Sequence, residues 1–478
     1  MTTDVLPTPP DQTIPALGRA HEHAQAFLAG LDGRPVAAPA DVEELRSRFF
    51  RPLPDKGCDP LQVIDELVAA ADRGLHASAG GRFHGWVIGG ALPAAVAADW
   101  MAAVWDQNAG NFAVSPASSI VEEAAGVWLK DVLGLPAHAS FGLVTGGQMA
   151  HVTCLLAARH WVLERRGWDV ERKGLFGAPP IRILAADVHH ASLDRAVRMI
   201  GLGQDAIVNL PSDEADRLRP DALERALADW DGPAIVALQA GELCTGAFDD
   251  FETLIPIARR AGAWVHVDGA IGLWATASRA RRHLPRGVEA ADSWAADGHK
   301  WLNTPYDCGL AFTAHPEAHS AALQQAASYM PASAGRDQIS WNPEFSRRAR
   351  GFAVYAALRE LGREGLERLI DRTSDHCRTL TRGIGALPGV EQLSDQQINQ
   401  GLVRFLDPHA SASDDDHDRR TDAVIAAICA SGETFFGGVS WRGRRAMRIS
   451  VSNWRTTDAD LQRTIAAVAR VLARNDLG

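Results

Sequence analysis

The amino-acid sequence predicts an α/β protein with a mostly parallel, buried sheet, followed by a smaller α+β lobe. Between about residues 140 and 315, short apolar or β-branched runs alternate with longer stretches of helical periodicity. That order is typical of parallel strands joined by helices. After about residue 350 the order changes to one long helical stretch, two strand-like runs and a closing helix. The two patterns predict three parts, which cover residues 1–92, 93–350 and 351–478.

The predicted elements follow one another along the chain. Helical patterns extend to about residue 80, and Ser115-Pro116 opens a further helix whose early turns carry Glu122 and Glu123, where the helix dipole favours acidic side chains. In the large part we expect strands at 141–146, 181–186, 206–210, 234–239, 263–268 and 309–314, and helices that include 149–167, 221–230 and 251–262. In the last part we expect a long helix from 351, strands at 401–406 and 446–452, and a helix from about 458. The acidic stretch 407–420 is expected to be a surface loop.

Composition and charge argue against a nucleic-acid-binding protein, a membrane protein and a disulfide-stabilised secreted protein. The formal net charge of −11 disfavours a nucleic-acid partner, because the arginine clusters at 347–350 and 442–445 are too short to form a broad basic face. The N-terminal residues lack the apolar core of a signal peptide, and the longest apolar tract, 86–105, is interrupted by proline, aspartate and glycine, so we expect no membrane span. Scattered cysteines form neither a metal-ligand pattern nor a disulfide framework, which predicts a cytoplasmic protein without a metal site. They are Cys58, Cys154, Cys244, Cys308, Cys377 and Cys429.

Three motifs fall at predicted strand ends, where α/β sheets place their ligands. The segment 145–147, Thr-Gly-Gly, precedes a helix, and its small residues let backbone N–H groups approach an anion, although a tight turn without a ligand has the same pattern. Asp268 ends the run 263–268 and could pair with a protonated ring nitrogen, cap a helix or form a buried ion pair. Lys300 has small and apolar neighbours, where an amine can form a Schiff base with a carbonyl, whereas an isolated lysine is more often a surface charge.

Together these motifs are the parts that pyridoxal phosphate requires: a phosphate cradle, an acid for the ring nitrogen and a Schiff-base lysine. The segments HVDGAIGLWA (266–275) and DSWAADGHKWLNTPYDCGLAF (292–312) resemble the pyridoxal-phosphate-dependent group II amino-acid decarboxylases, the family of aromatic-amino-acid and glutamate decarboxylases. Counterparts at 82–90, 115–129, 187–196 and 246–254 extend the resemblance over most of the chain. The resemblance implies an aspartate-aminotransferase-like fold (fold type I) and a homodimer with the active site at the subunit interface.

The resemblance also implies roles for individual residues. Lys300 would form the Schiff base, Asp268 would keep the ring nitrogen protonated, and Ala270 would pack on one face of the ring. His190 would stack on the other face, near the substrate carboxylate, with His189 as the competing histidine. Residues implied for the phosphate site are Thr145, Gly146, Gly147 and His299, with Asp297 or Ser293 as further candidates, and Trp86 matches a position that shapes the substrate pocket.

The implied reaction is decarboxylation of an L-amino acid to its amine through a Lys300 Schiff base and a quinonoid intermediate. Aromatic-amino-acid decarboxylases carry a loop tyrosine that returns a proton to this intermediate, but alignment on Trp341 puts Gln338 in its place. Tyr329, a histidine or water would then have to supply the proton. Loss of the acid could instead permit oxidative decarboxylation–deamination to an aldehyde.

Two further residues leave the substrate and the reaction type open. Glu242 departs from the family pattern and would either favour a cationic group on the substrate or form a salt bridge. Arg448 lies in the part of the small lobe where transaminating relatives of this fold grip the α-carboxylate, so transamination or Cα–Cβ lyase chemistry competes with decarboxylation. A dimeric scaffold that retains the cofactor site without turnover is a third possibility.

Overall fold

The computed structural model describes residues 11–324, 335–409 and 411–474. Within them, seven strands form a large sheet in the order β1-β7-β6-β5-β4-β2-β3. Neighbours from β6 to β3 are parallel, whereas β7 is antiparallel to both β6 and β1. The mostly parallel sheet is therefore confirmed. Its strands are β1 (Ser140–Val144), β2 (Arg182–Ala186), β3 (Ile207–Leu210), β4 (Ala234–Gln239), β5 (Trp264–Asp268), β6 (Ser293–Asp297) and β7 (Gly309–Thr313).

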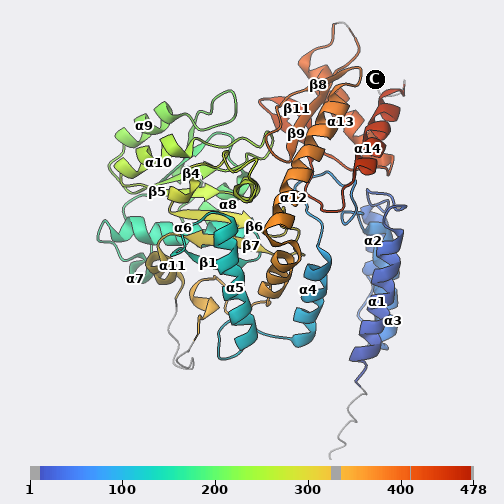
Figure 1. Cartoon of the computed structure of the whole chain (residues 1–478), viewed down its shortest axis with the longest axis horizontal. Coiled ribbons are helices and arrows are strands. Elements are labelled where there is room, and N and C mark those ends of the chain that lie inside the picture. The colour runs from blue at the N-terminus through green and yellow to red at the C-terminus, as the bar shows by residue number, and fades with distance from the viewer. Residues whose placement is uncertain (1–10, 325–334, 410, 475–478) are drawn as a thin grey trace, which may run out of the picture.

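Helices cover both faces of this sheet, because alternate residues of each buried strand point to opposite sides. One face carries Ile183, Ile235 and Trp264, which pack with residues of α6 and α8, and the other carries Val236 and Val265, which pack with residues of α5, α9 and α10. The helices of this part are α4 (Pro93–Trp105), α5 (Pro116–Val132), α6 (Gly147–Glu164), α7 (Val170–Lys173), α8 (Ala191–Met199), α9 (Pro220–Ala228), α10 (Phe251–Arg260) and α11 (Pro316–Leu323). Figure 1 shows the resulting layered lobe.

The strand β6 is an element that the sequence pattern missed. Its residues, Ser-Trp-Ala-Ala-Asp, include none of the β-branched side chains that favour strands, yet all five are buried between β5 and β7. The length of chain between Asp268 and Lys300 has room for one helix and one strand. The strand is β6, but in place of the helix the structure has two 3-10 helices, Gly272–Ala277 and Val288–Ala290. Tertiary packing therefore made a strand from a sequence with weak strand preference.

The C-terminal lobe contains a four-stranded antiparallel sheet in the order β10-β11-β9-β8, packed on α13 (Asp414–Ala430) and α14 (Asp458–Leu472). Its strands are β8 (Val390–Gln392), β9 (Gln400–Phe405), β10 (Gly437–Trp441) and β11 (Arg444–Ser450). The expected surface loop 407–420 is wrong in its second half. Ser413 and Asp416 form a capping box there, and the acidic residues occupy the favoured first turn of α13.

The long helix α12 (Gly351–Gly385) joins the two lobes (Figure 1). Its residues contact α4 and α5 of the large lobe and β9 and α14 of the small lobe. Gly362 interrupts the helical backbone with φ of 59°, a conformation that glycine adopts without a Cβ penalty. The kink at this position divides α12 into two helical segments.

The first three helices lie at the edge of the molecule (Figure 1). They are α1 (Thr13–Gly30), α2 (Val42–Phe49) and α3 (Pro60–Ala71), and no residue of any of them is buried. His21 of α1 contacts Trp100 of α4 with ring centroids 6.4 Å apart. Large apolar side chains on and beside them are exposed, among them Ile14, Phe50 and Leu53. Helices with apolar side chains and no buried face are typical of a surface that another chain covers.

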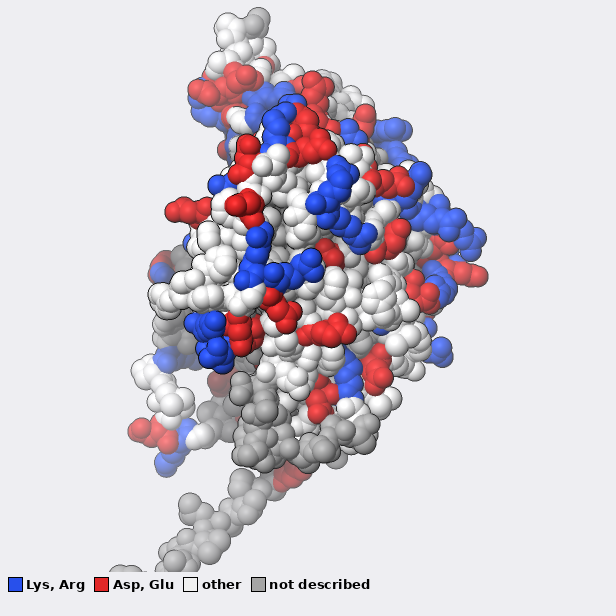
Figure 2. All heavy atoms as spheres, turned by 90° about the vertical axis from the view of Figure 1, so that its left-hand side faces the viewer, with Lys and Arg blue, Asp and Glu red and all other residues white. Residues whose placement is uncertain are grey.

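Charges are mixed on the face drawn in Figure 2, where acidic and basic side chains alternate without a broad basic area. Arg219 and Arg225 both pair with Asp221, and Arg260 pairs with Glu224. Among the described residues, no helix is long and apolar enough to cross a membrane, and no group of three or more His, Cys, Asp or Glu is arranged to hold a metal ion.

Candidate active site

The predicted site residues gather at one edge of the large sheet. Strands β2, β5 and β6 are parallel, and β1 points the same way because β7 runs antiparallel to both β1 and β6. Their carboxyl ends therefore share an edge. Thr145 follows β1, His190 lies just beyond β2, Asp268 ends β5, and Lys300 lies three residues beyond β6.

The amine of Lys300 is held by a buried carboxylate. Its Nζ lies 2.9 Å from Oδ2 of Asp297, which is 1% exposed. The other carboxylate oxygen, Oδ1, accepts the backbone N–H of Gly147 at 2.6 Å and lies 3.4 Å from Nε2 of His299. Asp297 therefore connects the lysine to the N-terminus of α6.

The two glycines at the start of α6 leave a cradle that larger residues would fill. A Cβ on Gly147 would lie 2.7 Å from Oδ2 of Asp297, and one on Gly146 would lie 3.1 Å from Cε1 of His299. The Gly147 N–H donates to Asp297, and the N–H groups that follow it in the first turn of α6 have no acceptor within the helix, as an anion such as phosphate requires. On the other side of the lysine, Gly89 packs so closely on the Lys300 carbonyl that no side chain fits there.

Asp268 is a carboxylate held in its charged form. Burial alone would raise the pKa of Asp268, but its interactions with His151, which include a hydrogen bond, and with the nearby His190 and Lys300 lower this pKa well below its usual range. Nε2 of His151 lies 3.4 Å from Oδ2, and the backbone N–H of Ala270 donates to Oδ1 at 3.1 Å. An anionic acceptor at this place suits a protonated ring nitrogen.

The structure distinguishes the two neighbouring histidines. His189 has both ring nitrogens engaged, Nδ1 with the Ala186 carbonyl at 2.8 Å and Nε2 with Asp194 at 3.1 Å. His190 caps α8 through Nδ1, which accepts the Ser192 N–H at 3.2 Å, and this leaves Nε2 without a partner among the described residues. His190 is solvent-accessible and lies within electrostatic reach of Asp268, Lys300 and Arg448. Burial lowers the pKa of His190, whereas the negative charge of Asp268 acts in the opposite direction and raises it.

Arg448 and Glu242 flank the same region from β11 and the loop after β4. The Arg448 side chain is 8% exposed, and its guanidinium forms no hydrogen bond or ion pair with any described residue. The Glu242 side chain stabilises its own loop, because its Oε2 accepts hydrogen bonds from the backbone N–H groups of Cys244 and Thr245, each at 2.7 Å. Burial raises the pKa of Glu242 and lowers that of Arg448.

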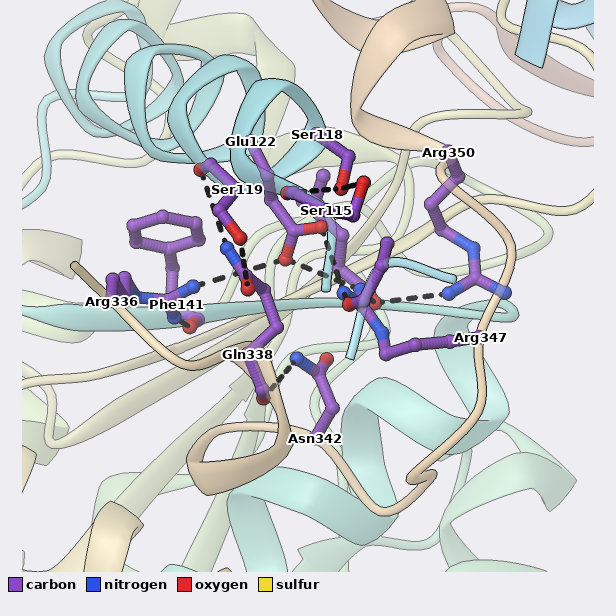
Figure 3. Close-up of polar contacts among 12 residues, drawn as sticks. Ser115, Ser118, Ser119, Glu122, Phe141, Arg336, Gln338, Asn342, Arg347 and Arg350 are labelled. Carbon is purple, nitrogen blue, oxygen red and sulfur yellow. Dashed lines mark hydrogen bonds and ion pairs between the residues drawn. The ribbon is translucent and has the colours of Figure 1, made fainter. Parts of the chain in front are cut away.

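Gln338 lies in a separate buried network (Figure 3). Its side chain accepts a hydrogen bond from the Ser119 hydroxyl at 2.9 Å and donates to the Ser119 carbonyl at 3.3 Å. Next to it, Glu122 pairs with Arg347 at 2.9 Å, and both side chains are almost fully buried. This network fastens the segment after residue 334 to α5, and its contacts do not bring Gln338 to Lys300. Tyr329 lies outside the described residues.

Two other candidates have different surroundings from those expected. Ser293 is fully buried, and its hydroxyl contacts Trp264 and His266 instead of opening toward the cradle. Trp86 has a left-handed backbone with φ of 49°, is 55% exposed, and stacks on Phe435 with ring centroids 5.5 Å apart.

Sequence reasoning missed Tyr306, one of only three tyrosines in the chain. Its ring stacks on His299 at a centroid distance of 4.3 Å. Tyr306 is 56% exposed in the single chain, and the partial burial of its phenol and the Asp297 carboxylate raise its pKa, so the phenol keeps its proton at neutral pH. The Lys300 segment could have identified Tyr306 from the sequence, because Tyr306 lies only six residues after the lysine.

Comparisons with known proteins bear on the family and the fold of the chain. A family model described as the pyridoxal-dependent decarboxylase conserved domain matches residues 44–406. The chain is 24% identical over 440 residues to aromatic-L-amino-acid decarboxylase of Bacillus atrophaeus, covering 90% of this chain and 89% of that protein. It is 25% identical over 441 residues to cysteine sulfinic acid decarboxylase of Homo sapiens, covering 88% of each. The crystal structure of Oryza sativa TDC with PLP and tryptamine matches with a TM-score of 0.90 and 21% identity, covering 97% of this chain and 98% of that chain.

Proposed function

Because the chain belongs to the pyridoxal-phosphate-dependent group II decarboxylase family, we propose that it removes the α-carboxyl group of an L-amino acid and releases the amine. The observation that carries this proposal is the meeting of Lys300 and Asp268 at the carboxyl ends of neighbouring strands β6 and β5, beside the open start of α6. An amine, an anionic acid and a phosphate cradle at one sheet edge match the three functional ends of the cofactor.

The residues divide the work of holding the cofactor. Pyridoxal phosphate, when bound, supplies an electron-withdrawing ring that stabilises the charge left at Cα when a bond to that carbon breaks. Lys300 would hold its aldehyde end and Asp268 its ring nitrogen. Gly146 and Gly147 would hold the phosphate, together with His299. Asp297 supports this arrangement by orienting the Lys300 amine through the 2.9 Å contact.

A small side chain and a flat side chain are proposed to cover the two faces of the cofactor ring. Ala270 is small, 9% exposed, and fixed to Asp268 through its N–H. His190 has a free Nε2 and lies at the solvent side of the site. We assign Ala270 to one face of the ring and His190 to the other.

Product analysis tests the reaction type. Purified protein loaded with pyridoxal phosphate is given a panel of L-amino acids, and CO₂, amine, ammonia, peroxide and keto acid are measured. We expect CO₂ and amine in equal amounts. Ammonia, peroxide and aldehyde would instead identify oxidative decarboxylation–deamination, keto acid formation without CO₂ would identify transamination, and cofactor binding without any product would identify a scaffold.

Arg448 is proposed to bind a carboxylate of the substrate, because its buried guanidinium has no partner among the described residues and lies in reach of His190. We expect Arg448→Gln to raise KM about 10–100-fold, the loss typical of one hydrogen-bonded charge. Steady-state kinetics on the preferred amino acid measure this. The matched control is Arg445→Gln on the same strand, since Arg445 pairs with Asp422 at the surface. An unchanged KM for Arg448→Gln would remove Arg448 from the substrate site.

Tyr306 is proposed to return the proton to Cα after CO₂ leaves, because its protonated phenol stacks on His299 next to Lys300. The electron pair of the broken C–C bond forms the new C–H bond, and water then reprotonates the phenolate. We expect Tyr306→Phe to lower kcat about 10²–10⁴-fold with cofactor binding unchanged. Tyr355→Phe is the control, since Tyr355 stacks on Trp128 in the helical layer. If Tyr306→Phe keeps the wild-type kcat, Tyr329 or a histidine becomes the proton source.

We also propose a cytoplasmic homodimer. The exposed apolar side chains on and beside α1–α5 support a second copy as the partner, because a single chain leaves them uncovered. They include Ile14, Phe50, Leu53, Trp100, Met101, Trp105, Val114, Ile120 and Val127. All six cysteines are free, as a reducing compartment favours.

A further inference from the structure

A row of buried polar side chains extends from Asp268 into the core. Nδ1 of His151 lies 2.8 Å from Nε2 of His266, whose Nδ1 lies 2.9 Å from the Ser293 hydroxyl. The indole N–H of Trp264 donates to the same hydroxyl at 2.9 Å. His151 is 1% exposed and the other three side chains are fully buried. We name these four residues the Asp268 relay.

The fold explains how residues far apart in sequence form this row. Trp264, His266 and Asp268 are alternate residues of β5, so their side chains point to the same face of the sheet. Ser293 pairs directly with His266 across the β5–β6 ladder. His151 comes from α6, which packs on this face. All four polar groups have partners, so the row carries no unsatisfied buried group.

The two ends of the relay fix the direction of its protons. An indole N–H can only donate, and a carboxylate can only accept. With both imidazoles neutral, one arrangement puts a single proton in each contact. In it Trp264 donates to Ser293, Ser293 to Nδ1 of His266, and Nε2 of His266 to Nδ1 of His151. His151 then carries its proton on Nε2, which faces Asp268 at 3.4 Å.

We infer that the Asp268 relay is a positioning device, in which Trp264 and Ser293 set the tautomers of two histidines so that His151 presents an N–H to Asp268 and keeps that carboxylate anionic and oriented toward the cofactor ring nitrogen. The burial of His266 supports its neutral form, because it lowers the pKa of His266 to about 3. The inference goes beyond the proposed function by assigning cofactor tuning to four residues behind the site. The inference requires that the protein binds pyridoxal phosphate, but it does not depend on which bond of the substrate is broken.

Cofactor binding without substrate tests the relay separately from the reaction. His151→Leu removes the donor to Asp268, and we expect the Kd for pyridoxal phosphate to rise about 10–100-fold, with a changed absorption spectrum of the bound cofactor. His151→Gln keeps a donor near the position of Nε2 but loses the Nδ1 acceptor, so it should recover part of the affinity and the spectrum. Fluorescence titration and visible absorption measure both, and melting of the cofactor-free protein checks the fold.

A second pair of variants separates the relay from general core packing. Ser293→Ala frees the tautomer of His266, and we expect a roughly 3–10-fold rise in Kd. Ser140→Ala is the matched control, because Ser140 lies on β1 of the same sheet and its hydroxyl also contacts a buried histidine, His319 of α11, at 2.8 Å. Wild-type Kd and spectra in both His151→Leu and Ser293→Ala would overturn the inference, and so would equal changes in Ser293→Ala and Ser140→Ala. If the wild-type protein releases no CO₂ from any amino acid, but the variants change the Kd and the spectrum as expected, the proposed function alone is contradicted.

Discussion

Replacement of Lys300 by alanine is expected to abolish turnover, with a loss of about 10⁴–10⁶-fold in kcat. The reason is covalent: Lys300 is the amine at the sheet edge, 2.9 Å from a carboxylate that orients it, and water cannot take over its bond to the cofactor aldehyde. Borohydride reduction followed by peptide mapping should place the cofactor on Lys300 in the wild-type protein and on no residue in the variant.

The composition of the chain makes this experiment easy to interpret. Only four lysines are present, at positions 56, 130, 173 and 300. Lys173→Ala is the control, because Lys173 ends the short helix α7 and lies over the ring of Trp168, away from the sheet edge. A cofactor adduct on another lysine, or wild-type kcat in Lys300→Ala, would contradict both the site and the proposed function.

Asp268→Asn is expected to lower kcat on the order of 10²–10⁴-fold while the protein stays folded. An amide has nearly the shape of the carboxylate but no charge, so it cannot stabilise a protonated ring nitrogen. Removing one partner of a buried charge pair costs about 3–5 kcal/mol, and each 1.36 kcal/mol in the barrier is tenfold in rate. The depressed pKa of Asp268 means that the anion is present throughout the neutral range, so the loss should not vanish at mildly acid pH.

A matched variant at the opposite edge of the sheet controls for the loss of any buried carboxylate. Asp292 immediately precedes β6, pairs with His315 at 2.8 Å and accepts the Val265 N–H. Asp292→Asn should change the melting temperature more than kcat. The assignment of Asp268 to the ring nitrogen fails if Asp268→Asn and Asp292→Asn have the same kcat, measured with saturating cofactor.

Prediction from sequence succeeded where neighbouring residues carry the signal. The apolar runs correspond to six strands of the large sheet, and the segments around Gly147, Asp268 and Lys300 identified the family from neighbouring residues alone. It failed where packing overrides local preference. The strand β6 lacks β-branched residues, and the start of α13 has the composition of an acidic loop until its capping box forms.

The sequence by itself determined the family and the cofactor, and it predicted residues to hold that cofactor, because these depend on side-chain type and on order along the chain. Only the tertiary structure decided which polar groups meet. His151 and His266 are 115 positions apart, and Gly147 and Asp297 are 150 apart. Buried polar groups need partners, but a sequence does not say which distant group will satisfy them. Sheet register and helix packing place these partners side by side, and this is why the Asp268 relay, the role of Asp297 and the burial of Gln338 are visible only in the folded chain.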